Sequence, residues 1–390
     1  MKTKRHLILY CLLAALPLHA QPAGNERDNL LSEIEKNNTT LAALRQKAVA
    51  EKQGNKVGNA LPDPKIGFSQ SWANKQTYSV EQELDWGTLS GLRKKVTSKS
   101  DEIAELNYQL ERQALLSEAD QLIVQLIYQN ALCEEMGYRE ERANTLRQLY
   151  EKKFKTGDAN QLEVNKVRLN HTATIANLMN VRAQRDNTLG ELKRLNGNRP
   201  IQCTTARYGQ TQLPPLANLM ERAESISPQL ALARTHIQRE QQQLQLSKSE
   251  AMPSLSLGYE GEFSKIERTN SLNIGMSIPV WSNTRNKVRQ QRASLTLAEM
   301  EQADTELQIR SDLDRRYNVA CQLLEIAAKF RKELTANEDI SILDKSLEAG
   351  QISLIEYLNE VDFYYDAHTQ VLEAERDSEM AVSELWSIFR

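Results

Sequence analysis

Apolar residues recur along this chain with two periods, one typical of long helices and one of short strands. From about Thr88 to Lys155, and again from about Asn283 to Ala349, no proline occurs, and the only glycines are Gly91 and Gly137. Within these spans, small and apolar residues recur three or four positions apart: Ala119, Leu122, Leu126 and Cys133 in the first, and Leu313, Tyr317, Ala320, Leu324 and Ala327 in the second. A helix of this length would extend for about 100 Å, which is too long to be supported by one compact core.

Each long helix is predicted to end at a glycine. Gly157 follows Phe154-Lys155-Thr156, and Gly350 follows Leu347-Glu348-Ala349. Glycine has no Cβ and takes the left-handed conformation that stops a helix at little cost.

A second helix is predicted to start directly after each glycine. Asn160 stands three residues before Glu163, and Ser353 stands three residues before Glu356. This spacing is the capping box, in which the first side chain and the glutamate each satisfy a backbone amide. The chain should therefore form two long antiparallel helical hairpins, preceded by shorter helices at about Leu41 to Asn59 and Leu230 to Ser249.

Four short segments between the helices alternate with period two, which predicts strands. The apolar positions are Ile66, Phe68, Trp72, Tyr78, Val80, Leu84, Leu255, Leu257, Tyr259, Phe263, Leu272, Ile274, Met276, Ile278 and Val280. The alternate positions are Gly67, Ser69, Ser71, Ser79, Glu81, Glu83, Ser254, Ser256, Glu260, Glu262, Asn273, Gly275 and Ser277. One face of such a sheet is apolar, and the other carries carboxylates.

Two environments are compatible with these strands. In a soluble protein the apolar face would pack on a core and the carboxylates would face water. Strands of roughly ten residues, with aromatic residues toward their ends at Trp72, Tyr78, Trp86 and Trp281, also match the length needed to cross a bilayer. Four strands are too few for a membrane barrel, which needs about eight, so this second environment requires several chains to share one barrel.

The two environments assign different roles to the same side chains. In a bilayer, Val80, Leu84, Leu257, Ile274 and Ile278 are expected to face lipid. The carboxylates Glu81, Glu83, Glu260 and Glu262 are then expected to face the lumen.

The pattern of elements occurs twice. Asn38 to Ala42 aligns with Ser227 to Ala231, Gly157 aligns with Gly350, and Glu191-Leu192 aligns with Glu384-Leu385. We therefore predict two repeats, 21–216 and 217–390, each with a strand hairpin, at 65–86 and 253–281 respectively.

Residues 1–20 have the features of a cleaved secretory signal. A basic start is followed by an apolar run too short to span a membrane, and Leu18-His19-Ala20 forms a plausible cleavage site. Removing the three positive charges of this segment changes the formal net charge from -3 to -6. A mildly acidic exported chain gives no electrostatic reason to expect nucleic-acid binding.

No catalytic, metal or cofactor site is predicted. Cys133, Cys203 and Cys321 have no short-spaced partner, and the histidines have no second ligand at helical spacing. No nucleophile, zinc-protease, phosphate-loop or dinucleotide motif occurs, so we do not expect an enzyme.

The order of these features resembles the outer-membrane efflux factors of the TolC family. The signal segment, the duplicated unit, Leu61-Pro62-Asp63-Pro64 and the stretch from Val80 to Gly87 carry the resemblance. The last two are most similar to the branch that serves cation-efflux pumps. The resemblance covers about Asn29 to Arg390.

This resemblance implies a mainly α-helical fold with a small β part. Three chains of the family each contribute four strands to a twelve-stranded barrel in the outer membrane of a Gram-negative bacterium, and their helices form a periplasmic tunnel. The channel is passive and works with a periplasmic adaptor and an inner-membrane pump, here of the resistance-nodulation-division (RND) type. The exported substance stays open, with metals, drugs and other amphiphiles as candidates. The alternative is a periplasmic adaptor or structural coiled-coil protein, whose helical hairpin would look similar.

The resemblance also implies roles at the two glycine turns. An adaptor is expected to dock at the tips, which we place at Lys155, Thr156, Gly157, Glu348, Ala349 and Gly350. Glu163 and Glu356 are candidates for a constricted entrance, and Asn359 stands where some members carry a second acid. Three copies of such a carboxylate would attract cations. The alternatives are simpler, because a helix cap alone explains the glycines and a capping box alone explains both glutamates.

Overall fold

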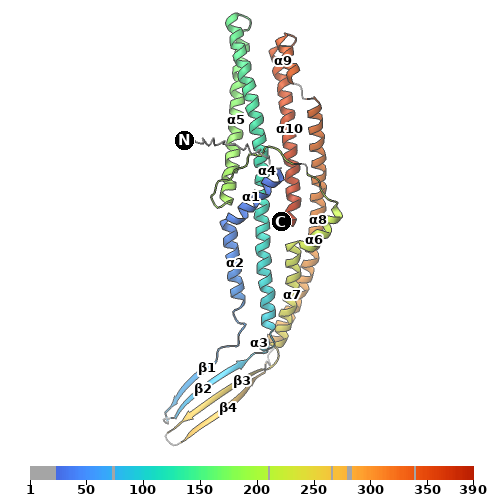
Figure 1. Ribbon diagram of the computed structural model, residues 1–390. Coiled ribbons are helices and arrows are strands. Elements are labelled where there is room, and N and C mark those ends of the chain that lie inside the picture. The colour runs from blue at the N-terminus through green and yellow to red at the C-terminus, as the bar shows by residue number, and fades with distance from the viewer. Residues whose placement is uncertain (1–22, 73–74, 210, 265–266, 279–282, 338–339) are drawn as a thin grey trace, which may run out of the picture.

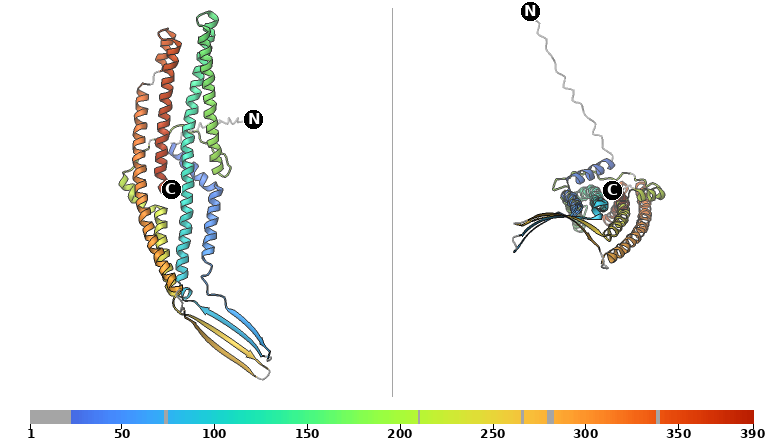
Figure 2. Two further views of the ribbon diagram at one scale, coloured as in Figure 1. Left: turned by 180° about the vertical axis from the view of Figure 1, so that it is seen from behind. Right: turned by 90° about the horizontal axis from the view of Figure 1, so that it is seen from below.

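The computed structural model describes residues 23–72, 75–209, 211–264, 267–278, 283–337 and 340–390. The predicted signal segment, Trp281 and Val280 lie outside these ranges. The molecule is elongated, with long helices running along its axis and a small sheet extending at an angle from one end (Figure 1). Figure 2 shows the same bend from behind.

Ten α-helices and four strands make up the described part of the chain, followed by a 3₁₀ turn. Their order is α1 (Ala23–Asn37), α2 (Thr39–Asn55), β1 (Lys65–Ser71), β2 (Lys75–Leu84), α3 (Trp86–Leu89), α4 (Leu92–Thr156), α5 (Gln161–Leu195), α6 (Leu216–Ile226), α7 (Pro228–Ser249), β3 (Ser254–Phe263), β4 (Arg268–Ser277), α8 (Asn283–Asn337), α9 (Ile340–Glu348), α10 (Leu354–Trp386) and η1 (Ser387–Phe389). The succession of elements from α1 to α5 recurs from α6 to α10, apart from the extra short helix α3 and with α8 and α9 together in the place of α4.

The mainly helical fold with a four-stranded antiparallel part is confirmed. The strands lie in the order β1-β2-β3-β4, so each hairpin pairs internally and β2 of the first joins β3 of the second. The two helical hairpins, α4 with α5 and α9 with α10, are also confirmed and form the end opposite the sheet (Figure 1).

Two predicted boundaries are wrong. The first long helix begins at Leu92, because Asp85 caps the short helix α3 and Gly91 then adopts a left-handed conformation with φ 72°. In the second long span, the described residues form α8 up to Asn337 and α9 from Ile340. β1 has seven residues rather than about ten, because Pro62 and Pro64 precede it and proline cannot donate to a ladder.

Helices α1 and α6 were not predicted. Each adds a short amphipathic element beside the long helices and contributes buried leucines or isoleucines. Leu30 and Ile34 of α1 pack in a cluster with Ile123 of α4, and Leu219 of α6 packs in another with Leu313 of α8.

The apolar interior is divided into several clusters along the axis. One joins α1, α4 and α5, a second joins α6, α7, α8 and α10, and a third joins the two hairpin ends. The predicted stripe on α8 contributes Leu313 and Ala320, both fully buried. A fold of this shape is supported by many local helix contacts, as expected for helices too long for one core.

Candidate functional site: the sheet, its junction and the helix tips

The register of the four strands places the apolar side chains on one face of the sheet. Ile66 pairs with Val80, Val80 with Tyr259, and Tyr259 with Leu272. Leu257 pairs with Ile274 in the same way. Directly opposed residues point to the same side of a sheet, so the period-two patterns combine into one continuous apolar face.

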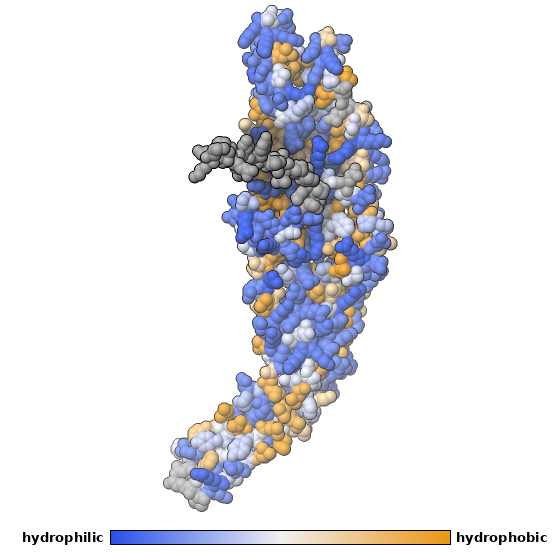
Figure 3. All heavy atoms as spheres, in the orientation of Figure 1, coloured by the Kyte–Doolittle hydropathy of each residue, from blue (hydrophilic) through white to orange (hydrophobic). Residues whose placement is uncertain are grey.

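This apolar face is not covered within the chain. Ile66 is 81% exposed, and Ile274 is 71% exposed. Hydrophobic residues gather over the sheet, whereas the helical surface is largely hydrophilic (Figure 3). A contiguous exposed apolar surface of this kind is typical of a membrane or protein contact rather than of a free soluble surface.

The opposite face carries the four predicted carboxylates among small polar residues. Glu81 pairs with Lys65, and Glu262 pairs with Thr77 and forms an ion pair with Lys75. Glu260 accepts a hydrogen bond of 3.4 Å from Asn273. The structure thus separates the carboxylates from the apolar residues as the sequence predicts.

The sheet is open at both edges. β1 pairs only with β2, and β4 pairs only with β3, within the described residues. The outer backbone groups of β1 and β4 therefore need partners if the sheet enters a bilayer, where unpaired backbone groups cost several kcal/mol each. The structure describes no helix that is long and apolar enough to cross a membrane.

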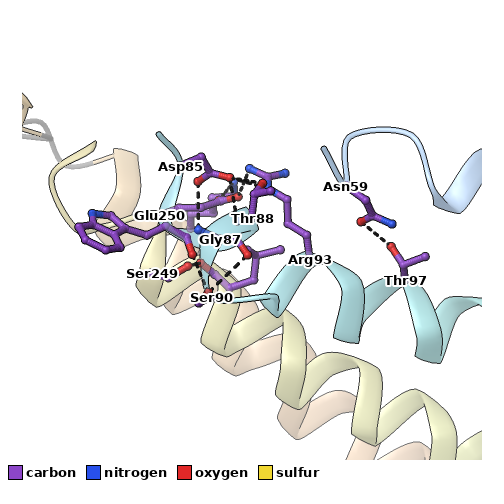
Figure 4. Close-up of polar contacts among 12 residues, drawn as sticks. Asn59, Asp85, Gly87, Thr88, Ser90, Arg93, Thr97, Ser249 and Glu250 are labelled. Atoms are coloured by element: carbon purple, nitrogen blue, oxygen red, sulfur yellow. Dashed lines mark hydrogen bonds and ion pairs between the residues drawn. The ribbon is translucent and has the colours of Figure 1, made fainter. Parts of the chain in front are cut away.

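A polar network joins the sheet to the helices (Figure 4). Asp85 caps α3 by accepting 3.1 Å hydrogen bonds from the amides of Gly87 and Thr88. Arg93 Nε donates to Asp85 Oδ2 at 2.8 Å and its Nη2 donates to Glu250 Oε1 at 3.3 Å. Trp86 Nε1 donates to the carbonyl oxygen of Pro253 at 2.6 Å. The end of β2 is thereby tied to α7 and to the start of β3.

Replacing Arg93 by Met is expected to weaken this junction by about 2 kcal/mol, because two carboxylates lose a half-buried cationic donor. Thermal unfolding followed by circular dichroism measures the change, with Lys94→Met as the control at an exposed neighbouring position. Arg93→Lys should recover part of the loss. Equal midpoints for the Arg93→Met and Lys94→Met variants would contradict the proposed tie.

The two helix tips are built alike. Gly157 has φ 85° and Gly350 has φ 69°, and the following residues, Asp158 and Gln351, donate 2.8 Å bonds back to Lys153 and Ser346. In each tip the glycine amide also donates a hydrogen bond, from Gly157 to the carbonyl oxygen of Phe154 and from Gly350 to that of Leu347. The two bonds together form the Schellman motif that ends a helix. A Cβ at either glycine would meet no atom within 4 Å, so the backbone conformation, not space, requires glycine there.

Both capping boxes are present. Asn160 N donates to Glu163 Oε2 at 2.8 Å while Glu163 N donates to Asn160 Oδ1 at 3.0 Å. Ser353 and Glu356 make the equivalent pair at 2.8 and 3.2 Å. These hydrogen bonds with Ser353 lower the pKa of Glu356, which keeps its exposed carboxylate ionised at neutral pH. Asn359 is exposed on the next turn.

The two hairpins contact each other just below the tips. Tyr150 and Val167 of the first are buried in one cluster with Leu354 and Val361 of the second. Beside it, Asp344 of α9 accepts 2.7 Å hydrogen bonds from Arg142 Nη2 and from the Tyr357 hydroxyl. Burial and this bond to Asp344 raise the pKa of Tyr357, so its hydroxyl stays protonated and donates.

Asp344→Asn is expected to lower the free energy needed to separate the two hairpins locally by about 1 to 2 kcal/mol. The reason is that a charge-assisted hydrogen bond is replaced by a neutral one at a half-exposed site. Amide hydrogen exchange in residues 340–360 should then be faster, while exchange in residues 161–195 changes little. Asp158→Asn serves as a control, because the Asp158 side chain accepts a hydrogen bond from Thr156 of its own tip and, within the described residues, makes none to the other hairpin. Unchanged exchange in 340–360 would show that Asp344 does not hold the hairpins together.

Sequence reasoning missed a buried charged network at mid-length. Asp120 of α4 is fully buried and makes two 2.5 Å contacts with Arg27 of α1, Nε to Oδ1 and Nη2 to Oδ2. Ser383 and Arg390 also contact Asp120 Oδ2. Arg27 Nη1 donates to Glu379 at 3.2 Å. The available signal was an aspartate beside Ala119 and Ile123 on a stripe that is otherwise apolar.

The described residues contain no group of three or more His, Cys, Asp or Glu side chains arranged to hold a metal ion. Cys133, Cys203 and Cys321 are half-buried free thiols. Burial raises the pKa of Cys203 to about 11, so this thiol is unreactive at neutral pH.

Comparison with known proteins identifies the fold. The model of a family described as outer membrane efflux protein matches residues 219–388, which is less than half of the chain. No curated protein sequence matches.

Several solved structures are similar over nearly the whole chain. The CmeC outer membrane channel of Campylobacter jejuni is 15% identical with a TM-score of 0.72, covering 93% of this chain and 85% of CmeC. CusC, described in connection with transmembrane channel formation, is 13% identical with a TM-score of 0.75 and coverages of 93% and 92%. The outer membrane protein VceC of Vibrio cholerae is 12% identical with a TM-score of 0.72 and coverages of 93% and 96%. The chain therefore has the fold of these proteins.

Proposed function

We propose that this chain is a member of the outer membrane efflux protein family and forms the exit channel of a three-part export system. Three copies would each supply four strands to one twelve-stranded barrel in the outer membrane of a Gram-negative bacterium. Their helical hairpins would form a tunnel through the periplasm. The channel itself would be passive, with energy supplied by an inner-membrane pump of the RND type.

The observation that carries this proposal is the open sheet with one exposed apolar face. Lipid would cover the apolar side chains, which are otherwise exposed to water. Neighbouring copies would supply hydrogen-bond partners for the backbone groups at the free edges of β1 and β4. Val80, Leu84, Leu257, Ile274 and Ile278 would then contact lipid. Glu81, Glu83, Glu260 and Glu262 would line the lumen.

The open sheet argues against the alternative of a periplasmic adaptor or coiled-coil protein, which has no need of an exposed apolar sheet. Cell fractionation tests the choice directly. The proposed channel should appear in the outer membrane as a trimer that resists dissociation until heated. A soluble periplasmic monomer would favour the alternative.

At the opposite end, the tips would form the periplasmic entrance and the docking surface of an adaptor. Lys155, Thr156 and Gly157 would serve in the first tip, and Glu348, Ala349 and Gly350 in the second. The separation of these tips from the sheet along the molecule supports this role (Figure 1). The solved structures are similar to this chain to nearly the same degree, with TM-scores of 0.72 and 0.75 for CmeC and CusC, so they do not favour the cation-efflux branch. The exported substance therefore stays open within the proposal.

Glu356→Gln is expected to reduce the cation preference of the reconstituted channel while leaving the tip intact. Glutamine also completes a capping box, so the substitution removes the charge and keeps the helix cap. Three carboxylates at a narrow entrance would attract cations, and Glu163 would add to the effect, whereas Asn359 adds no charge.

Single-channel reversal potentials in a salt gradient measure this preference. Glu191→Gln, on an exposed part of α5 far from the tip, is the matched control. If Glu356→Gln and wild-type channels show the same reversal potential, Glu356 is a helix cap and nothing more.

A further inference from the structure

The two helix tips of one chain have the same shape. Equivalent positions differ by 193 in number, as in Gly157 and Gly350. Leu149 and its counterpart Ile342 are both exposed, and so are Leu162 and its counterpart Ile355. The tips thus offer matching apolar positions around matching turns.

Their charges, however, are opposite. Residues 147–170 contain six basic and three acidic residues, a net charge of +3. The equivalent residues 340–363 contain one basic and five acidic residues, a net charge of -4. The reversal includes the position next to the turn, where Lys155 corresponds to Glu348.

Several of these charges are free to meet a partner. The side chains of Lys152 and Lys155 are exposed and make no hydrogen bond or ion pair within the described residues, and the same holds for the side chains of Glu348 and Glu360. By contrast, Arg168 is paired with Glu151, and Asp344 is paired with Arg142. The two tips thus have net charges of opposite sign on the same shape, with Lys155 and Glu348 at equivalent positions, and this indicates that they select partners of opposite charge.

We propose that the two tips bind helical-hairpin ends of opposite charge. The first tip, at Lys152 and Lys155, takes an end that carries carboxylates beside an apolar residue. The second, at Glu348 and Glu360, takes an end that carries lysine or arginine. This inference rests on the proposed function, in which the tips form the periplasmic mouth and meet an adaptor.

The opposite charges of the two tips determine which hairpin end binds at each tip. In a trimer, six tips of alternating sign would surround the mouth, and a like-charged end would be repelled from every second site. The interaction acts within a Debye length of about 8 Å at physiological salt, so it selects ends at contact and weakens as salt is added.

Site-specific crosslinking to two model peptides tests the proposal. The peptides are two-helix hairpins that differ only in the turn, one with Glu-Leu-Glu and one with Lys-Leu-Lys, and each carries a thiol-reactive group there. Thr156→Cys and Ala349→Cys are equivalent exposed positions in the two tips, and the parent chain measures background from the native cysteines. The acidic peptide should label Thr156→Cys about tenfold faster than Ala349→Cys, which corresponds to about 1.4 kcal/mol, and the basic peptide should show the reverse.

Charge reversal provides the matched control. Adding Lys152→Glu and Lys155→Glu to the Thr156→Cys chain should transfer its preference to the basic peptide. Lys94→Glu with Lys95→Glu, at the other end of α4, should not. Equal labelling of both tips by both peptides, or labelling by neither, would overturn the inference. Conductance of the same preparations in planar bilayers is measured separately, so a failure of charge selection in a working channel is distinct from a failure of the channel proposal.

Discussion

Replacing Ile274 by Arg is expected to abolish stable assembly in the outer membrane. Ile274 lies on the exposed apolar face of β4, opposite Leu257. A charge that faces lipid costs about 2 to 4 kcal/mol near the bilayer midplane, and three copies per barrel would cost about 6 to 12 kcal/mol. The measurement is the amount of heat-resistant trimer recovered from outer-membrane fractions.

The control is one residue away. Asn273 lies on the opposite face of the same strand, where it donates to Glu260. Asn273→Arg should therefore assemble normally, because the new guanidinium would point to the polar side and lie near a carboxylate. If both variants assemble equally well, the apolar face does not contact lipid and the soluble arrangement of the sheet is the better account.

Asp120→Asn is expected to destabilise the helical part by about 3 to 5 kcal/mol, because Arg390 then loses this buried carboxylate and Arg27 keeps only Glu379. Asp120 is fully buried between Arg27 and Arg390, and asparagine fills the same space without the charge. Denaturant unfolding followed by circular dichroism, at equal protein concentration, measures the loss.

Glu118→Gln is the matched control on the same helix. Glu118 pairs with Arg194 at 3.3 Å, but both side chains are more than half exposed, and such pairs contribute about 0 to 1 kcal/mol. If Asp120→Asn and Glu118→Gln unfold at the same denaturant concentration, the buried network does not stabilise the molecule.

The effect of Asp120 should also depend on pH. Burial alone would raise the pKa of Asp120, but the hydrogen bonds and charge of Arg27 outweigh it, and the pKa lies below its usual range. A lowered pKa in the folded state contributes stability that is present above the unfolded pKa of about 3.9 and is lost as pH falls through the folded pKa. The difference between wild type and Asp120→Asn should therefore shrink below about pH 4 and stay constant above about pH 5.

Local sequence patterns predicted the parts of this molecule that depend on neighbouring residues. The alternation of apolar and polar residues predicted the two faces of the sheet, because successive residues such as Val80 and Glu81 point to opposite sides of a strand whatever pairs with them. A glycine followed by a capping box predicted both helix tips. The hydrogen bonds that form these turns and caps join residues at most five positions apart.

The parts that were missed depend on residues far apart in the chain. Arg27 contacts residues 93 and 352 positions away, and Arg142 reaches Asp344 across 202 positions. No local period reports such pairs. The start of α4 was missed for another reason: Gly91 fits an uninterrupted helical pattern, and only the cap at Asp85 shows that a separate short helix precedes it.

In the proposed channel, three copies complete one barrel through the free edges of β1 and β4. Crosslinking these edges tests whether they meet. Ser69→Cys on β1 is combined with a cysteine at Thr269, Ser271 or Asn273 on the same polar face of β4, and the membranes are oxidised. For at least one pair, we expect a covalent product that stops at three chains and is absent from either single variant. A ladder that continues beyond three chains, a product that stops at two, or no product from any pair would contradict it.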